Sequence, residues 1–130
     1  MSDSTLPLDL YTSILRVKNL ERSLAWYENV LGLRSITRDT HYRLVELAGE
    51  KGQRIALREL NDGKPVATAG LRSMYPVFLT PDADAKHAEL EAQGHRVEPV
   101  QDHPGVRLFW LYDPDNHPLC ILQFVMEWGA

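Results

Sequence analysis

The chain has 130 residues, 44% of them hydrophobic and 25% charged, with a formal net charge of −4 at pH 7, a composition that suits a single globular domain. The acidic balance and the scatter of Lys and Arg along the chain argue against a nucleic-acid partner, and no apolar run approaches the roughly 18 residues that a membrane helix needs. Cys120 is the single cysteine, so no internal disulfide can form, and the polar N-terminal arm lacks the pattern of a signal peptide. We therefore expect a cytoplasmic protein.

The first half of the chain predicts the order strand, helix and three strands. Asn19 is a favourable N-cap residue and Gly32 suits a left-handed residue after the C-terminus, so a helix is expected between them. Its apolar residues recur on one helical face, namely Leu20, Leu24, Tyr27 and Leu31. Strands are predicted at Tyr11–Lys18, Arg34–Asp39, His41–Leu47 and Gln53–Leu60, with a turn at Ala48–Gly52.

The second half predicts the same order after a linker at 61–72, which contains Asn-Asp-Gly-Lys-Pro. A helix is expected between an N-cap at Asp82 and a stop at Gly94. Strands are predicted at Ser73–Thr80, His95–Val100, Val106–Tyr112 and Pro118–Val125, with a turn at Asp113–Asn116 between the last two.

The two halves are an internal repeat. Asn19 and Asp82 lie 63 positions apart, and Gly32 and Gly94 lie 62 apart. Repeated supersecondary units of this kind indicate a duplicated module, here with the order βαβββ.

Two segments resemble the glyoxalase, bleomycin-resistance and extradiol-dioxygenase family, the vicinal-oxygen-chelate superfamily. Leu15 to Leu33 is similar to its first-module signature, D-L-x-x-S-x-x-F-Y-x-x-x-L-G, with Trp26 in place of Phe. Asp113 to Leu122 is similar to its closing D-P-D-G-N-x-x-E-L, with Asn116 in place of Gly. The resemblance implies a single α+β domain over 1–130, in which tandem βαβββ modules (about 9–60 and 73–126) form a half-open mixed β-barrel with flanking helices. It also implies a homodimer.

Enzymes of this family hold a divalent metal with His or Glu side chains from the first and last strand of each module. The positions that match here are Thr12, Ala56, Tyr75 and Cys120. Ala56 has no ligating atom, and two neutral hydroxyls with one thiol bind divalent cations poorly. We therefore expect no metal cofactor, although a site built from other residues stays open.

Alternation along the predicted strands places a set of side chains on the inward face of the sheets. The predicted ligand-binding residues are Thr12, Arg16, Glu46, Arg58, Tyr75, Trp110, Cys120 and Phe124. They would form an apolar, aromatic trough with Arg and Glu groups near its ends.

Each of these residues also has a purely structural interpretation. Trp110 and Phe124 would serve equally as core aromatics, and Cys120 as a small buried hydrophobe. Tyr75 would bond either a ligand or a backbone carbonyl. Arg16 stands where the glyoxalase I branch has an arginine that contacts an anionic substrate, or it pairs with a surface carboxylate.

Three classes of function remain. The first is a metal-independent protein that binds an apolar or aromatic ligand with an anionic group, as in the bleomycin-resistance branch. The second is a metal-dependent lyase, isomerase or ring-cleaving dioxygenase. The third is a sensing or accessory module that acts through protein contacts. The missing metal ligands and the aromatic trough favour the first, although fold alone cannot decide among them.

Overall fold

The computed structural model describes residues 6–60, 72 and 74–125. The chain divides into two compact units between Lys64 and Pro65. This division falls in the predicted linker at 61–72, which lies outside the described residues except for Arg72.

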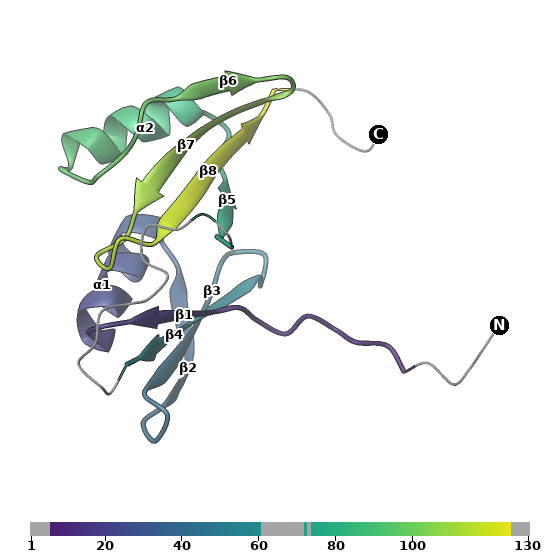
Figure 1. Ribbon diagram of the computed structural model, residues 1–130, viewed down its shortest axis with the longest axis vertical. Coiled ribbons are helices and arrows are strands. Elements are labelled where there is room, and N and C mark those ends of the chain that lie inside the picture. The colour runs from purple at the N-terminus through teal and green to yellow at the C-terminus, as the bar shows by residue number, and fades with distance from the viewer. Residues whose placement is uncertain (1–5, 61–71, 73, 126–130) are drawn as a thin grey trace. The chain divides into compact units, whose positions relative to one another are not determined.

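The first unit is a four-stranded sheet with one helix (Figure 1). Its elements follow the order β1 (Ile14–Val17), α1 (Leu20–Leu31), β2 (Arg34–Asp39), β3 (Leu44–Ala48) and β4 (Arg54–Glu59). The strands lie side by side in the order β1-β4-β3-β2. β1 and β4 are parallel, while β4–β3 and β3–β2 are antiparallel.

The second unit repeats this topology with β5 (Val77–Leu79), α2 (Ala83–Ala92), β6 (Gln101–His103), β7 (Val106–Tyr112) and β8 (Pro118–Phe124). The strand order is β5-β8-β7-β6, and again only the first pair is parallel. The predicted α+β class and the duplicated βαβββ order are therefore confirmed. Neither sheet closes on itself into a barrel.

Helix α1 begins and ends where the sequence predicts. The Asn19 side chain accepts a hydrogen bond from the Arg22 N–H at 2.9 Å, which satisfies one of the unpaired donors of the first turn. Gly32 follows the helix with φ 70°, and its N–H bonds the Glu28 carbonyl at 3.1 Å. Only a residue without a β-carbon adopts that conformation at little cost.

Helix α2 is built in the same way. The Asp82 carboxylate accepts a hydrogen bond from the Ala85 N–H at 3.0 Å. The helix stops at Ala92, and Gly94 has φ 84°. Its buried residues are Ala83 and Leu90. No helix in the described ranges is long and apolar enough to cross a membrane.

Each helix covers one face of its own sheet. The α1 backbone donates from the Leu20 N–H to the Glu59 carboxylate, so α1 lies on the β4 face that carries Glu59 and Leu57. In the second unit, the Ala83 N–H of α2 bonds Gln123 of β8. Alternation therefore gives each sheet a face that packs on its helix and a face that points away from it.

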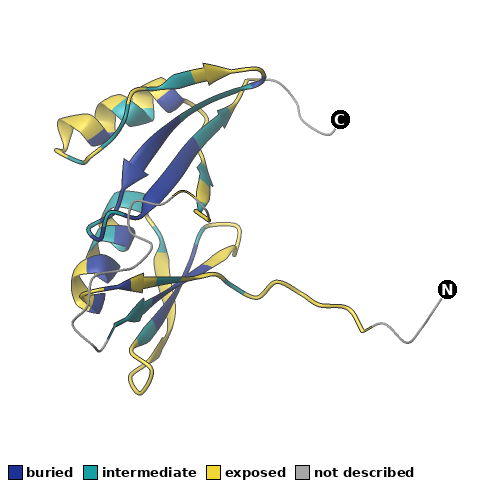
Figure 2. Ribbon diagram, in the orientation of Figure 1, coloured by how far each residue is buried: buried dark blue, intermediate teal, exposed yellow. Residues whose placement is uncertain are grey.

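The helix-facing sides hold most of the core. In the first unit Val17, Val45, Leu47 and Leu57 are fully buried. In the second, Phe109, Leu111 and Leu119 are fully buried, and Figure 2 shows much of β7 and β8 as buried. Burying such side chains contributes about 1.5–3 kcal/mol each, which makes these faces the main source of stability.

The strands β1, β3 and β4 of the first unit differ from their predicted bounds. β1 begins at Ile14 instead of Tyr11, and its ladder to β4 starts with the pair Ile14 and Ala56. β3 begins at Leu44 instead of His41, because a turn occupies 40–43, with Arg43 at φ 52°. β4 is one residue shorter than predicted at each end.

In the second unit the strand predicted at His95–Val100 is wrong. Only an isolated bridge joins Val97 to Leu111 there, because Pro99 has no N–H to donate to a ladder. Pairing resumes in β6 at Gln101. β5 begins at Val77 instead of Ser73, which lies outside the described residues. β8 ends at Phe124 instead of Val125.

The predicted turn before β8 is confirmed. Asp113 Oδ1 accepts hydrogen bonds from the N–H groups of Asp115 and His117, at 2.9 and 2.8 Å. Asn116 takes the left-handed conformation, with φ 68°, which Asn tolerates better than most residues.

Candidate functional site

Arg16, Glu46 and Arg58 lie on the face of the first sheet that points away from α1. Arg16 is directly opposite Arg58 across the β1–β4 pair, and Glu46 is opposite Ala56 across the β3–β4 pair. Since Ala56 and Arg58 are two residues apart on β4, all these side chains share one face. We call Arg16, Glu46 and Arg58 the polar face of the first sheet.

The two arginines bring like charges together. Residues directly opposite in neighbouring strands have their side chains in contact range, and equal charges in such positions are unfavourable. Arg16 is exposed and Arg58 half-buried, and the Arg58 guanidinium lies 5.7 Å from the centre of the Tyr42 ring. A carboxylate or phosphate that accepted hydrogen bonds from both guanidinium groups would be stabilised.

Glu46 is a buried acid on the same face, with 7% of its surface exposed. Thr37 donates its hydroxyl to Glu46 Oε1, while Arg54 Nη1 lies 3.7 Å from Oε2. Hydrogen bonds from Thr37 first, and from Tyr11 second, hold the pKa of Glu46 below its usual value, although burial acts in the opposite direction. The carboxyl is thus an anion at neutral pH.

Thr12 lies outside β1, so strand alternation does not determine the direction of its side chain. It helps to line a cavity of about 530 Å³ where the arm before β1 runs beside the turn into β4. Tyr11 and Arg54 belong to the same cavity wall and contact each other, with Arg54 Nη1 3.2 Å from the Tyr11 hydroxyl. Thr12 thus stands beside the polar face instead of on it.

The second sheet presents aromatic side chains on the equivalent face. Val77, Cys120 and Trp110 are opposite one another across β5, β8 and β7. Trp110, Tyr112 and Cys120 are buried together and pack with Leu108 and Leu122.

Tyr75 and Phe124 complete this surface. Tyr75 precedes β5, but its ring meets the edge of Trp110 with the ring centres 4.7 Å apart. Phe124 lies further along β8 on the same face and is 49% exposed. We call Tyr75, Trp110, Cys120 and Phe124 the aromatic face of the second sheet.

Sequence reasoning missed Arg72, which belongs to the aromatic face. Its guanidinium lies 4.1 Å from the centre of the Trp110 ring and donates to the Tyr112 hydroxyl and to Glu98, both at 2.6 Å. Tyr112 also donates to Glu98 and, with Arg72, lowers the pKa of that carboxyl. Arg72 lay in the predicted linker, where no periodicity marks a side chain's direction.

Cys120 behaves as a buried apolar side chain. Burial raises the pKa of its thiol, and the charge of Arg72 only partly opposes this. A raised pKa disfavours the nucleophilic, metal-binding thiolate. The structural interpretation of Cys120 is therefore the better supported one.

The four positions that would hold the family's metal do not fit one. Ala56 is buried between Ile14 and Glu46 and offers no donor atom. Tyr75 packs on Trp110, and Cys120 lies in an apolar cluster. Among the residues that the structure describes, no three His, Cys, Asp or Glu side chains are grouped as a metal site would require.

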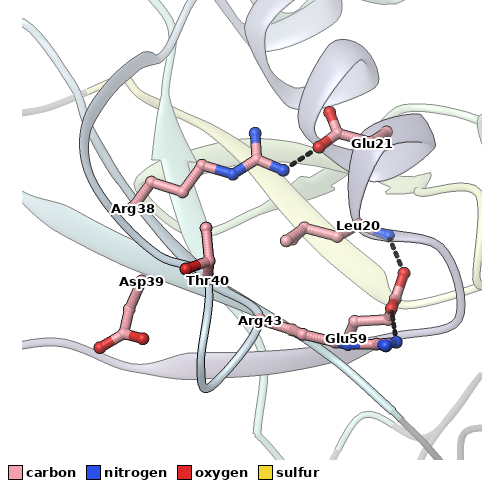
Figure 3. Close-up of a pocket in the computed structure, with 7 residues that line it drawn as sticks. All are labelled: Leu20, Glu21, Arg38, Asp39, Thr40, Arg43 and Glu59. Atoms are coloured by element: carbon pink, nitrogen blue, oxygen red, sulfur yellow. Dashed lines mark hydrogen bonds and ion pairs between the residues drawn. The ribbon is translucent and has the colours of Figure 1, made fainter.

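A second cavity of the first unit, of about 350 Å³, lies beside the start of α1 (Figure 3). The Glu59 carboxylate accepts bonds from the Leu20 N–H at 3.0 Å and from Arg43 at 2.6 Å, and Arg38 pairs with Glu21. These bonds lower the pKa of Glu59, the Leu20 N–H most strongly. Glu21 and Glu59 are each paired with an arginine of the cavity wall, and Glu59 also accepts a bond from the first turn of α1.

A family model matches most of this chain. The model of the Glyoxalase/Bleomycin resistance protein/Dioxygenase superfamily matches residues 8–121. Among curated proteins, none matches.

Solved structures share the fold at low sequence identity. A glyoxalase/bleomycin resistance protein/dioxygenase superfamily member from Sphaerobacter thermophilus has a TM-score of 0.75 at 22% identity, covering 90% of this chain and 98% of its own. TnmS3, an antibiotic-binding protein from Streptomyces sp. CB03234, has 0.71 at 18%, covering 92% and 99%. The fosfomycin resistance protein FosX from Listeria monocytogenes has 0.69 at 18%, covering 89% and 91%.

Proposed function

The chain belongs to the Glyoxalase/Bleomycin resistance protein/Dioxygenase superfamily, and from this premise we propose that it binds a small apolar or aromatic molecule with an anionic group, without a metal. The polar face of the first sheet would hold the anionic group. Binding sites for small molecules are commonly apolar surfaces with a few convergent polar groups.

The observation that carries the proposal is the pairing of Arg16 with Arg58. Arg16 and Arg58 are opposite each other in the parallel β1–β4 pair, so a carboxylate or phosphate between them could accept hydrogen bonds from both guanidinium groups. The planar guanidinium forms two hydrogen bonds with a carboxylate or phosphate, which favours these groups over a monatomic anion.

The fold neighbours support the same class of function. TnmS3 is an antibiotic-binding protein and FosX a fosfomycin resistance protein by their names, so this fold accommodates small-molecule recognition. The alternative of a metal-dependent lyase, isomerase or dioxygenase lacks support from the side chains at the four metal positions. No observation favours the sensing or accessory module.

The test is a binding screen with aromatic acids such as benzoate and 1-naphthoate, followed by calorimetry on variants. We expect Arg16→Ala and Arg58→Ala each to weaken binding about ten- to a hundred-fold, since a charge-assisted contact contributes roughly 1.5–3 kcal/mol. Arg38→Ala is the matched control, because Arg38 pairs with Glu21 elsewhere in the unit and should leave affinity unchanged.

Metal independence is tested separately by elemental analysis of the protein purified without chelator. We expect less than a tenth of an equivalent of Zn, Ni, Fe or Mn per chain, and binding of the acids that dialysis against EDTA does not change. One equivalent of metal, with binding lost on chelation, would contradict this part of the proposal and favour an enzyme.

A further inference from the structure

The larger cavity of the first unit is formed by two segments of the chain that the β1–β4 pair brings together. Its volume is about 530 Å³, and its wall consists of residues 9–13, which precede β1, and residues 52–54, which lead into β4. Cavities of roughly 300–1,000 Å³ are typical of small-molecule sites. Thr12 is the one predicted ligand-binding residue in this wall, and the proposed anion site does not use it.

Arg54 brings hydrogen-bond donors to the cavity. Its Nη1 group bonds the Tyr11 hydroxyl at 3.2 Å and lies 3.7 Å from Glu46 Oε2. Glu46 thus compensates the charge of Arg54, while Nε and Nη2 have no hydrogen-bond partner among the described residues. The Arg54 side chain is 38% exposed, so a ligand in the cavity can reach these donors.

Asp9 brings acceptors to the same wall. Its side chain is exposed, and its carboxylate forms no hydrogen bond or ion pair with any residue that the structure describes. The ion pair of Arg54 is made with Glu46 and not with Asp9, although both Asp9 and Arg54 line the cavity. The cavity therefore offers spare donors and spare acceptors together, without an uncompensated positive charge that would select an anion.

Tyr11 contributes an aromatic surface that its hydroxyl holds in place. The hydroxyl accepts a bond from Arg54 and donates to Glu46, and this second bond is the largest cause of the raised pKa of Tyr11. The ring is 64% exposed, with the Arg54 guanidinium 5.3 Å from its centre. An exposed aromatic face attracts the C–H groups of a ligand ring through dispersion and apolar burial.

We propose that this cavity binds a neutral saccharide, with a C–H face of the sugar ring on Tyr11 and sugar hydroxyls bonded to Asp9 and Arg54. A hydroxyl group donates one hydrogen bond and accepts others, so neighbouring hydroxyls of one sugar satisfy the carboxylate and the guanidinium together. A carboxylate ligand would meet the negative charge of Asp9, and an apolar ligand would leave the spare donors and acceptors unpaired.

This inference goes beyond the proposed function, because the two sites are separate. Arg54 and Arg58 are four residues apart on β4, which corresponds to about 13 Å along an extended strand. A saccharide beside Tyr11 and an aromatic acid at Arg58 should therefore bind independently of each other.

The experiment measures the binding of glucose, galactose and maltose by saturation-transfer NMR and calorimetry, with glycerol as a polyol that has no ring face. We expect at least one saccharide to bind at millimolar concentration, and glycerol not to bind. Tyr11→Ala and Asp9→Ala should each weaken that saccharide about ten-fold, whereas Tyr11→Phe, which keeps the ring, should lose less. Asp39→Ala is the matched control, because Asp39 lines the other cavity of the unit, and it should leave saccharide affinity unchanged.

Three results would overturn the proposal: no saccharide binding at tens of millimolar, equal binding of glycerol, or an affinity that survives in both Tyr11→Ala and Asp9→Ala. If Tyr11→Ala does not fold, Asp9→Ala still decides, because the exposed Asp9 carboxylate forms no bond with the described residues. Competition with benzoate would place both ligands in one site and contradict the separation. Failure of benzoate to bind while a saccharide binds would remove the anion site and leave this site standing.

Discussion

Arg72 stacks its guanidinium on the Trp110 ring at 4.1 Å, while its hydrogen bonds reach Tyr112 and Glu98. One side chain thus ties the segment before β5 to β7. The Arg72 side chain is 39% exposed. Each of its contacts therefore contributes less to the free energy of unfolding than it would in the protein interior.

Replacing Arg72 should therefore destabilise the protein modestly. For Arg72→Ala we expect a loss of about 1 kcal/mol in the free energy of unfolding. Arg72→Lys should recover only part of it, because an ammonium group lacks the planar stacking surface. Urea titration measures both, with Lys51→Ala as a control that should stay within about 0.5 kcal/mol of the wild type. A full recovery by lysine would show that the charge alone matters.

Glu59 should make stability depend on pH. Its pKa is lowered in the folded protein, mainly by the Leu20 N–H and then by Arg43, so its contribution is complete above the ordinary carboxyl value of 4.5 and is lost as the pH falls through the lower folded value. We expect Glu59→Gln to cost about 1 kcal/mol at pH 7 and progressively less below pH 4.5. Chemical denaturation from pH 3 to 7, with Glu50→Gln as the control, tests this; a cost that stays constant with pH would refute the ionic contribution.

Gly32 should resist substitution for reasons of backbone conformation alone. It has φ 70°, and a β-carbon added there would meet nothing within 4 Å. We therefore expect Gly32→Ala to destabilise by about 1–2 kcal/mol through the left-handed conformation, although no clash occurs. Gly49→Ala, where the nearest atoms would be 3.9 Å away and φ is not positive, is the matched control. If thermal melts gave equal losses for both variants, the conformational explanation would be wrong.

Asp113 should be the most sensitive polar residue of the second unit. It is 5% exposed, and its Oδ1 accepts two backbone hydrogen bonds from the turn before β8. Asp113→Ala leaves both donors without that acceptor, and we expect a loss of about 2–3 kcal/mol. Asp113→Asn retains an acceptor oxygen and should lose less. Calorimetric melting of the two variants gives the comparison, and equal losses would assign the effect to charge.

The protein is expected to be a homodimer. Each sheet ends in strands that pair on one side only within their own unit, and open edges of this kind are commonly covered by a second chain. Light scattering at micromolar concentration should give twice the 14.8 kDa mass of the chain. A mass of one chain under these conditions would contradict the prediction.

The sequence by itself determined the features that depend on local chemistry. The side chains of Asn19 and Asp82 accept hydrogen bonds that cap their helices, and Gly32 ends α1 in a left-handed conformation that is unfavourable for residues with a β-carbon. Asn116 takes the place of a glycine in the Asp113 turn. Alternation also placed Arg16, Glu46 and Arg58 on one face correctly, since side-chain direction in a paired strand is fixed by parity.

Only the tertiary structure decided the features that depend on a partner distant in the chain. The ladder between β1 and β4 starts only at Ile14 and Ala56, and Pro99 interrupts the pairing before β6, which begins at Gln101. Arg72 reached Trp110 from a segment without periodicity, and the hydroxyls of Thr37 and Tyr11 came to Glu46 from other segments of the chain. Parity predicts the direction of a side chain, but which donors come within hydrogen-bond distance is set by the packing of strands and loops around it.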